Sequence, residues 1–427
     1  MTRDPEPWNA VRTAVPDADQ IEYLRRVRAI PSAGGEEGAL ARFVAQSLRA
    51  MGIRTELAPC LPDRPAVVAR IPGRGRGPSL MLLAHLDVPA MAPGWTRDPF
   101  RAVVTGGRIY GAGVRDMKAG LAAMVMAMRA VRQARVRLEG DLVLVAVPGH
   151  MEQGVGAKRV FDAGVTADLV LVGEPTGLDL LSTHLGWSVL ELTVHGRETS
   201  TVTAGEGVNA LEGAATVIRS LAGMRFRRAP VSSYVRRFLP ATPCYVSAVG
   251  IQGGNPYYPN VVPGRCSVTV DVRFVPGKAP RDILREVKAR LAVLARQDRT
   301  LRVSARLKYD FALQPVMSRP EEPLYRVTRD AVRWARGAEP RLAGFFYTTD
   351  GGVFQEGSGS PTVVCGPGHA PLRAPDEWVS TREYLQSTAV YVRAALETAG
   401  RTREAMAAAY PPGAADRRPP PGRATPR

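Results

Sequence analysis

Three side chains of types that bind divalent metals stand next to apolar segments of this chain. His85 follows the apolar run 80–84, Asp116 precedes the mostly apolar stretch 119–131, and Glu174 follows the apolar run 169–173. A histidine nitrogen and carboxylate oxygens are ligands that zinc takes in proteins. Each residue alone has an ordinary explanation, as a structural histidine, a helix N-cap or a loop acid. Their combination predicts a metal site, in which Asp87 would hold His85 from behind.

The elements that must position these residues are predicted from the hydrophobic pattern. Apolar strands are expected at 66–71, 80–84, 142–147 and 169–173, with helices at 119–131 and 158–163. Continuous apolar strands that alternate with helices predict an α/β fold with a central, mostly parallel sheet covered on both faces. Functional side chains gather at the carboxyl ends of such strands.

The pattern changes after Gly186. Strands are expected at 187–194, 245–251, 267–274 and 301–305, and helices at 209–224 and 281–294. This βαββαβ order is ferredoxin-like. We therefore predict a small α+β domain at 187–305, inserted into a larger metal-binding domain formed by 1–186 and 306–410. The proline- and arginine-rich segment 411–427 is predicted to be a disordered tail.

Composition narrows the class of protein. The chain has 427 residues and a net charge of +17. The arginine excess reflects either a GC-rich genome or an anionic partner, such as an acidic carrier protein. No motif typical of nucleic-acid binding appears, so no nucleic-acid partner is expected. No apolar run of about 18 residues exists, so no membrane span is expected. The polar N-terminus shows no signal peptide, which predicts a cytoplasmic protein.

Several motifs occur in the order found in one enzyme family. They are HLDVP at 85–89, Trp95 with DPF at 98–100, the stretch 111–120, GEPT at 173–176, GG at 253–254 with NVVP at 260–263, DVR at 271–273, and GPG at 366–368 with APDE at 374–377. With these motifs, the chain resembles the M20 family of metallopeptidases and deacylases. That family includes glutamate carboxypeptidase, acetylornithine deacetylase and succinyl-diaminopimelate desuccinylase.

The resemblance implies a zinc-binding catalytic domain with an inserted lid domain through which two chains form a homodimer. By position, His85, Asp116 and Glu174 would hold one zinc ion, and Asp116 would bridge to a second. The resemblance thus predicts the same three ligands as the residue types do.

The chain departs from the family at four positions. The family's glutamate base and the ligand glutamate beside it fall on His150 and Met151, and the late ligand histidine falls on Arg373. The lid histidine that contacts the substrate oxyanion falls near Ser200. A thioether is a poor ligand for such a cation and a guanidinium would repel one. We therefore expect one divalent cation, with the second site empty.

Three interpretations of His150 stay open: a replacement base, since histidine titrates near neutrality, a ligand of the remaining metal, or a residue without a catalytic role. Glu152 and His369 are further candidates for the vacated roles.

Other residues are predicted to contact substrate. Asn260 and Arg273 lie in lid motifs, although Arg273 could instead form an internal ion pair. Thr349 lies in a predicted strand-end loop at 347–352. Ser200, Arg373 and His369 complete the predicted substrate-binding set.

These expectations give three functional hypotheses. The first is a metal-dependent enzyme that acts on an amide-containing, amino-acid-like or N-acyl small substrate, by hydrolysis or by a non-hydrolytic reaction such as acyl transfer, condensation or cyclisation in a biosynthetic pathway. The second is an inactive homologue that serves as a binding or scaffold protein. The third is a deacylase whose substrate is tethered to an acidic carrier protein.

Overall fold

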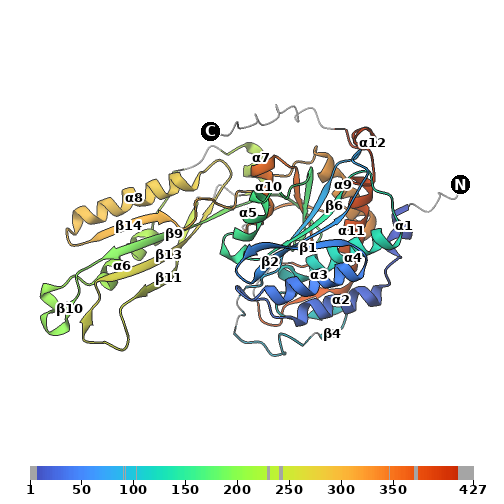
Figure 1. Ribbon diagram of the computed structural model, residues 1–427. Coiled ribbons are helices and arrows are strands. Elements are labelled where there is room, and N and C mark those ends of the chain that lie inside the picture. The colour runs from blue at the N-terminus through green and yellow to red at the C-terminus, as the bar shows by residue number, and fades with distance from the viewer. Residues whose placement is uncertain are drawn as a thin grey trace. The chain divides into compact units, whose positions relative to one another are not determined.

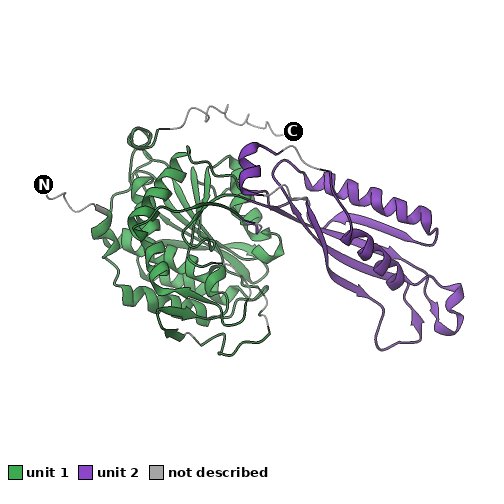
Figure 2. Cartoon of the chain, turned by 180° about the vertical axis from the view of Figure 1, so that it is seen from behind, with its two compact units in different colours: residues 1–183, 316–344, 349–427 green, residues 184–315, 345–348 purple. Residues whose placement is uncertain are grey.

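The chain forms two compact units. The computed structural model describes residues 7–89, 91, 93–101, 103–227, 231–239, 244–345, 347–369 and 374–411 (Figure 1). Unit 1 comprises Met1–Thr183, Val316–Gly344 and Thr349–Arg427, and unit 2 comprises His184–Pro315 and Phe345–Thr348 (Figure 2). The predicted tail at 411–427 lies outside the described residues, apart from Pro411.

Unit 1 is built on a six-stranded sheet. Its strands, in spatial order, are β1 (Arg54–Leu61), β2 (Arg64–Ile71), β6 (Leu142–Val147), β3 (Leu80–His85), β7 (Leu169–Val172) and β16 (Thr362–Val364). The last four strands are mutually parallel, whereas β1 and β2 are antiparallel to their neighbours. The predicted α/β fold with a mostly parallel central sheet is confirmed.

Helices cover the sheet because its strands are apolar on both sides. Alternate residues of β3, such as Leu80 and Leu82, share one core cluster with helix α4 (Ala119–Gln133). Packed around α4 are α2 (Asp17–Ala29), α3 (Gly38–Ala50) and α11 (Thr381–Glu397), and α11 in turn contacts α9 (Pro323–Arg336). The helices α5 (Val155–Asp162) and α10 (Gly351–Ser358) pack against each other and against β1, β7 and β16. This double cover is what continuous apolar strands require.

Smaller elements complete unit 1. The strands β4 (Val103–Thr105), β5 (Arg108–Tyr110) and β17 (Trp378–Ser380) form a three-stranded sheet, and β8 (Leu180–His184) pairs with β15 (Leu342–Phe345). The short helices α1 (Pro7–Arg12) and α12 (Arg403–Ala409) lie near the two ends of the described chain. Within the described ranges, no helix combines the length and the apolar content that a membrane span needs.

Unit 2 has the βαββαβ order predicted from the sequence. The chain runs through β9 (Gly186–His195), α6 (Ala210–Ala222), β11 (Tyr245–Gly253), β13 (Arg265–Phe274), α8 (Pro280–Gln297) and β14 (Arg302–Leu307). The antiparallel sheet has the order β11-β13-β9-β14, which places β11 at one edge. A two-stranded pair of β10 (Thr199–Ser200) and β12 (Val261–Val262) and the short helix α7 (Ser233–Phe238) complete the unit.

Candidate metal centre

The carboxyl ends of three parallel strands bring His85, Glu174 and His150 together. His85 is the last residue of β3 and is aligned with Val147, the last residue of β6. Glu174 follows β7 by two residues, and His150 follows β6 by three. Because β6, β3 and β7 are parallel neighbours, their ends meet at one edge of the sheet. This edge is where open α/β sheets place functional groups.

The distances from His85 to the two carboxylates fit ligands of one tetrahedral cation. The Nε2 atom of His85 lies 3.1 Å from Oδ1 of Asp116 and 3.4 Å from Oε1 of Glu174. Two ligand atoms that are each about 2.1 Å from a tetrahedral ion lie about 3.4 Å apart. The Oε1 atom of Glu174 is buried and accepts no hydrogen bond from the described residues. A buried carboxylate oxygen without a donor is what a cation site would leave in a ligand-free chain.

The loop before α4 positions Asp116. Gly113 has a left-handed backbone (φ 68°), and a Cβ atom there would lie 2.1 Å from Cγ1 of Val88, so only glycine fits. The Glu377 carboxylate accepts hydrogen bonds from the backbone of Gly113 and Val114. The loop that carries Asp116 is therefore held in place by Glu377, a buried acid of the APDE motif.

His150 joins the same cluster. Its ring stacks on that of His85, with centroids 4.5 Å apart and planes inclined by 7°. One potential ligand atom from each of His85, His150 and Glu174 lies within 4.8 Å of the other two. These distances alone would allow the three residues to bind one metal ion. The Nδ1 atom of His150 lies 3.0 Å from Oδ1 of Asp350, and both side chains are buried.

Asp87 acts differently from the prediction. The Nδ1 atom of His85 lies 2.8 Å from the backbone oxygen of Asp87 and 3.7 Å from its carboxylate. The carboxylate instead accepts hydrogen bonds from the backbone nitrogens of His150 (3.0 Å) and Met151 (2.7 Å). Asp87 thus orients His85 through its main chain and anchors the 150–152 turn through its side chain.

Glu152 contacts a second group of side chains that holds the 150–152 turn, formed by Arg64 and Glu37. Its carboxylate lies 2.5 Å from Nη2 of Arg64, which also binds the fully buried Glu37 at 2.6 Å. Glu37 further accepts a hydrogen bond from the backbone nitrogen of Gly149. The turn that carries His150 is therefore held at its backbone by two buried carboxylates. Glu37 and Arg64 were not foreseen, because no motif links residues so far apart in sequence.

The buried carboxylates dominate the electrostatics of the cluster. Burial alone would lower the pKa of His85, but the carboxylates of Glu174 and Asp116 outweigh it and raise that pKa well above its usual value. Burial also raises the pKa of Glu174. For His150, burial acts downward on the pKa, and the Asp350 carboxylate more than compensates, so the pKa is raised. Without a cation, this site holds protons that a cation would have to displace.

The predicted substrate-binding residues lie in several places. In unit 2, Ser200 and Asn260 are exposed, and Ser200 accepts a hydrogen bond from the backbone of Val202. Arg273 forms an ion pair with Asp271 at 3.0 Å, in agreement with the internal pairing considered as its alternative.

In unit 1, Thr349 is fully buried, and the predicted loop at 347–352 ends where α10 begins at Gly351. His369 is exposed and lies 3.6 Å from Glu383, outside the metal-ligand cluster. Arg373 lies outside the described residues. The structure therefore brings together the predicted ligands, His150 and Asp87, and leaves the substrate-binding set unassembled within either unit.

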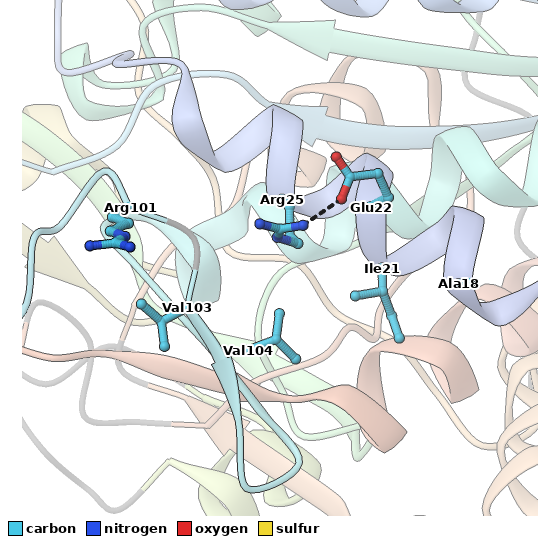
Figure 3. A pocket seen from close by; sticks show the side chains of 7 residues that line it. All are labelled: Ala18, Ile21, Glu22, Arg25, Arg101, Val103 and Val104. Carbon is cyan, nitrogen blue, oxygen red and sulfur yellow. Dashed lines mark hydrogen bonds and ion pairs between the residues drawn. The ribbon is translucent and has the colours of Figure 1, made fainter.

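A surface cavity of about 630 Å³ in unit 1 lies elsewhere and includes none of these residues (Figure 3). Its lining is Ala18, Ile21, Glu22, Arg25, Arg101, Val103 and Val104. Arg25 in that cavity is paired with Glu22 at 2.7 Å. The cluster of buried ligands, and not this cavity, is the candidate functional site.

The chain is similar in sequence to several proteins that are named as enzymes. The chain is 28% identical to the N-formyl-4-amino-5-aminomethyl-2-methylpyrimidine deformylase of Halalkalibacterium halodurans over 345 residues, which cover 74% of this chain and 79% of that one. It is 28% identical to the acetylornithine deacetylase of Edwardsiella ictaluri, with coverage of 84% and 93%. It is 26% identical to the succinyl-diaminopimelate desuccinylase of Methylorubrum extorquens, with coverage of 85% and 94%.

Solved structures share the fold. The di-peptidase Dug1p of Saccharomyces cerevisiae superposes with a TM-score of 0.76 at 14% identity, covering 92% of this chain and 99% of that one. Human carnosine dipeptidase 1 gives a TM-score of 0.72 at 18% identity, with coverage of 92% and 100%. The family model of peptidase family M20/M25/M40 matches residues 81–397, which is well over half of the chain. The protein therefore belongs to peptidase family M20/M25/M40.

Proposed function

We propose that this protein is a metal-dependent hydrolase that cleaves the amide bond of a small, N-acylated, amino-acid-like substrate. The observation that carries the proposal is a buried group formed by His85 and Glu174 at the strand ends and by Asp116 from the loop before α4, in which Nε2 of His85 lies 3.1 Å from Asp116 and 3.4 Å from Glu174. The names of three relatives support the substrate class, because they describe removal of a formyl, an acetyl or a succinyl group.

One cation, zinc, is proposed to bind to His85, Asp116 and Glu174. Two carboxylates and a neutral imidazole balance the charge of one divalent ion, and a thioether at Met151 offers little to a second. A related Bacillus subtilis protein is named as a dinuclear metal-binding peptidase of the M20 family, so a one-cation site would set this chain apart. When bound, such a cation supplies Lewis-acid polarisation of the amide carbonyl and of the attacking water.

His150 is proposed to accept the proton of the attacking water, in place of the family's glutamate. It lies in the ligand cluster, and its backbone is fixed by Asp87. A positioned general base contributes about 10²–10⁴ in rate. The contribution of Glu152 to catalysis stays a prediction, since its carboxylate lies on Arg64. The substrate contacts predicted for Ser200, Asn260, Arg273, Thr349, His369 and Arg373 likewise stay predictions.

A homodimer through unit 2 is part of the proposal. The edge strand β11 exposes most of its residues, including Val249 (63%) and Ile251 (55%). An edge strand leaves backbone donors and acceptors unpaired, and apolar side chains on it favour pairing with another strand. A second copy of this chain offers the same edge, so two β11 strands could join in an antiparallel pair.

The proposal is tested with purified zinc-loaded protein and a panel of N-formyl, N-acetyl and N-succinyl amino acids. We expect release of free amine from at least one class, with kcat reduced at least 10²-fold in His150→Ala and unchanged in the matched control His195→Ala, which alters an exposed histidine of unit 2. Zinc-loaded protein that turns over none of the panel contradicts the proposal.

The same assays separate the alternatives. A product in which the acyl group moves to an added amine, without net hydrolysis, favours acyl transfer, and bound zinc without turnover of any kind favours a scaffold protein. A carrier-tethered substrate would lose affinity steeply with added salt, because an acidic carrier would bind through charge. The cytoplasm stays the proposed compartment.

A further inference from the structure

We propose that Asp350 is a positioning residue for His150, and that it holds the imidazole beside the metal ligands and outside the coordination sphere of the cation. The inference rests on the one-cation site proposed above. It assigns a role to a buried acid of the loop 347–352, which was predicted only to contact substrate, and it decides between two interpretations of His150, as a ligand or as a base.

The contact between the two residues is buried and close. The Nδ1 atom of His150 lies 3.0 Å from Oδ1 of Asp350, with 9% and 2% of the side chains exposed. Neither carboxylate oxygen of Asp350 accepts a hydrogen bond of regular geometry from the described residues, so the contact with His150 is a close ion-pair distance. A buried carboxylate is costly unless it faces a partner, so its placement against the imidazole is specific.

Asp350 is mounted on a tightly packed element. It directly precedes α10, which packs against β7, β16 and α5. At Gly351, a Cβ atom would lie 2.8 Å from both Thr362 Cγ2 and Val172 Cγ2, so the start of the helix sits directly on the sheet. The carboxylate therefore has little freedom to follow His150 if the imidazole turns.

The other side of His150 is fixed as well. Its backbone nitrogen donates to Oδ1 of Asp87 at 3.0 Å, and the preceding residue Gly149 donates to the buried Glu37. With the backbone held by Asp87 and the ring held by Asp350, His150 has one preferred orientation.

That orientation conflicts with metal ligation. An imidazole nitrogen binds a metal along its lone pair, which lies in the plane of the ring. The rings of His85 and His150 are inclined by only 7°, with centroids 4.5 Å apart. Parallel rings in van der Waals contact face to face are roughly 3.5 Å apart, and at that separation a cation in the plane of His85 would lie far out of the plane of His150. The distances within 4.8 Å are short enough for shared ligation, but the ring orientation opposes it.

Carboxylate contact at Nδ1 has a chemical consequence. It favours the tautomer with the proton on Nδ1, which leaves Nε2 as the nitrogen that accepts a proton or a hydrogen bond. Asp350 would thus act through His150 and would not touch the substrate.

X-ray absorption at the zinc edge tests the inference without an activity assay, because it counts imidazoles bound to the metal. For zinc-loaded wild-type protein we expect one imidazole, that of His85. For Asp350→Ala we expect two, because the released ring of His150 can turn toward the cation. Asp350→Asn keeps an acceptor at the same place and should retain one. Two imidazoles in the wild type, one in Asp350→Ala, or no bound zinc would each overturn the proposal.

Kinetics supply an independent readout. Asp350→Ala should lower kcat about 10–100-fold with KM changed less than about threefold, as expected for a residue that orients a base. In a His150→Ala background the same substitution should have no further effect, because residues that act as a unit are not additive. A full additional loss in that background would overturn the proposal.

Asp179→Asn is the matched control, because Asp179 is also a buried aspartate, paired with Arg336 at 3.2 Å, outside the cluster. It should leave the zinc spectrum and kcat unchanged. If the wild-type protein hydrolyses none of the acyl amino acids yet shows one bound imidazole, the hydrolase proposal fails while the positioning role of Asp350 stands.

Discussion

The imidazole rings of His85 and His150 lie parallel, with centroids 4.5 Å apart and planes inclined by 7°. One ring ends β3 beside Asp116 and Glu174, and the other follows β6 and faces Asp350. His150 thus faces a carboxylate that His85 does not, although one of its ring nitrogens also lies within 4.8 Å of Glu174. This arrangement supports the proposed division of roles, in which His85 binds the cation and His150 accepts a proton.

Zinc binding should release at least one proton at neutral pH. The pKa of His85 is raised by Glu174 and Asp116 against the effect of burial, so the metal-free site is protonated and the cation competes with that proton. The affinity should fall as pH is lowered, by about tenfold per pH unit for each proton displaced. Calorimetry in two buffers of different ionisation enthalpy measures the proton count. An affinity that is independent of pH between 6 and 8 would contradict this assignment.

Loss of Arg64 should be far more costly than loss of Glu152. Arg64→Leu leaves the fully buried Glu37 carboxylate without its cation, which costs about 3–5 kcal/mol of unfolding free energy. Glu152 is partly exposed, so Glu152→Gln should cost less than about 1 kcal/mol. Urea unfolding measures the unfolding free energies of both variants. Similar losses of unfolding free energy would argue against Arg64 as the partner of the buried Glu37. The same Glu152→Gln variant tests its predicted catalytic role, because a base would lose at least 10²-fold in kcat.

Glu377 should make the stability of the metal-free protein fall as pH rises from 4.5 to 7. Burial, together with the nearby Asp116 carboxylate, raises the pKa of Glu377 to about 7. The folded state then binds more protons than the unfolded state in that window, so its stability decreases until the folded-state pKa is passed. The full effect is about 3 kcal/mol. Glu377→Gln should remove this part of the slope, which pH-dependent urea unfolding would reveal. An unchanged slope would show that the pKa of Glu377 is not raised in the folded protein.

A charge on the β11 edge should prevent the proposed dimer. Ile251→Lys places an ammonium group on the exposed edge strand, where two copies would bring like charges together. Val202→Lys is the control, since Val202 is exposed in unit 2 but lies on the turn after β10. Light scattering at micromolar concentration should give a dimer for the wild type and the control and a monomer for Ile251→Lys. A monomeric wild type would rule out this interface.

The sequence predicted the sheet, and the position of His85 and Glu174 beside its strands, because both depend on local patterns. Apolar runs located β3, β6 and β7, and the parallel order then placed His85 and Glu174 at one edge. The predicted loop at 347–352 extended over the first two residues of α10, Gly351 and Gly352, because glycines are poor helix formers.

Contacts between distant segments could not be predicted in the same way. The pairing of His150 with Asp350 and the binding of Arg64 to Glu37 depend on how α10, the 149–152 turn and β2 pack in space. No periodicity or spacing in a single sequence encodes such contacts, and the orientation of the His150 ring against His85 is equally non-local.

Zinc content per chain tests the central claim most directly. Purified protein, saturated with zinc and freed of excess metal, should hold one equivalent by elemental analysis. The His85→Ala variant should hold less than about a tenth of that, because it lacks one of the three proposed zinc ligands. His195→Ala should keep the full equivalent. Two equivalents in the wild type would contradict the one-cation site, and no bound zinc would contradict the enzyme itself.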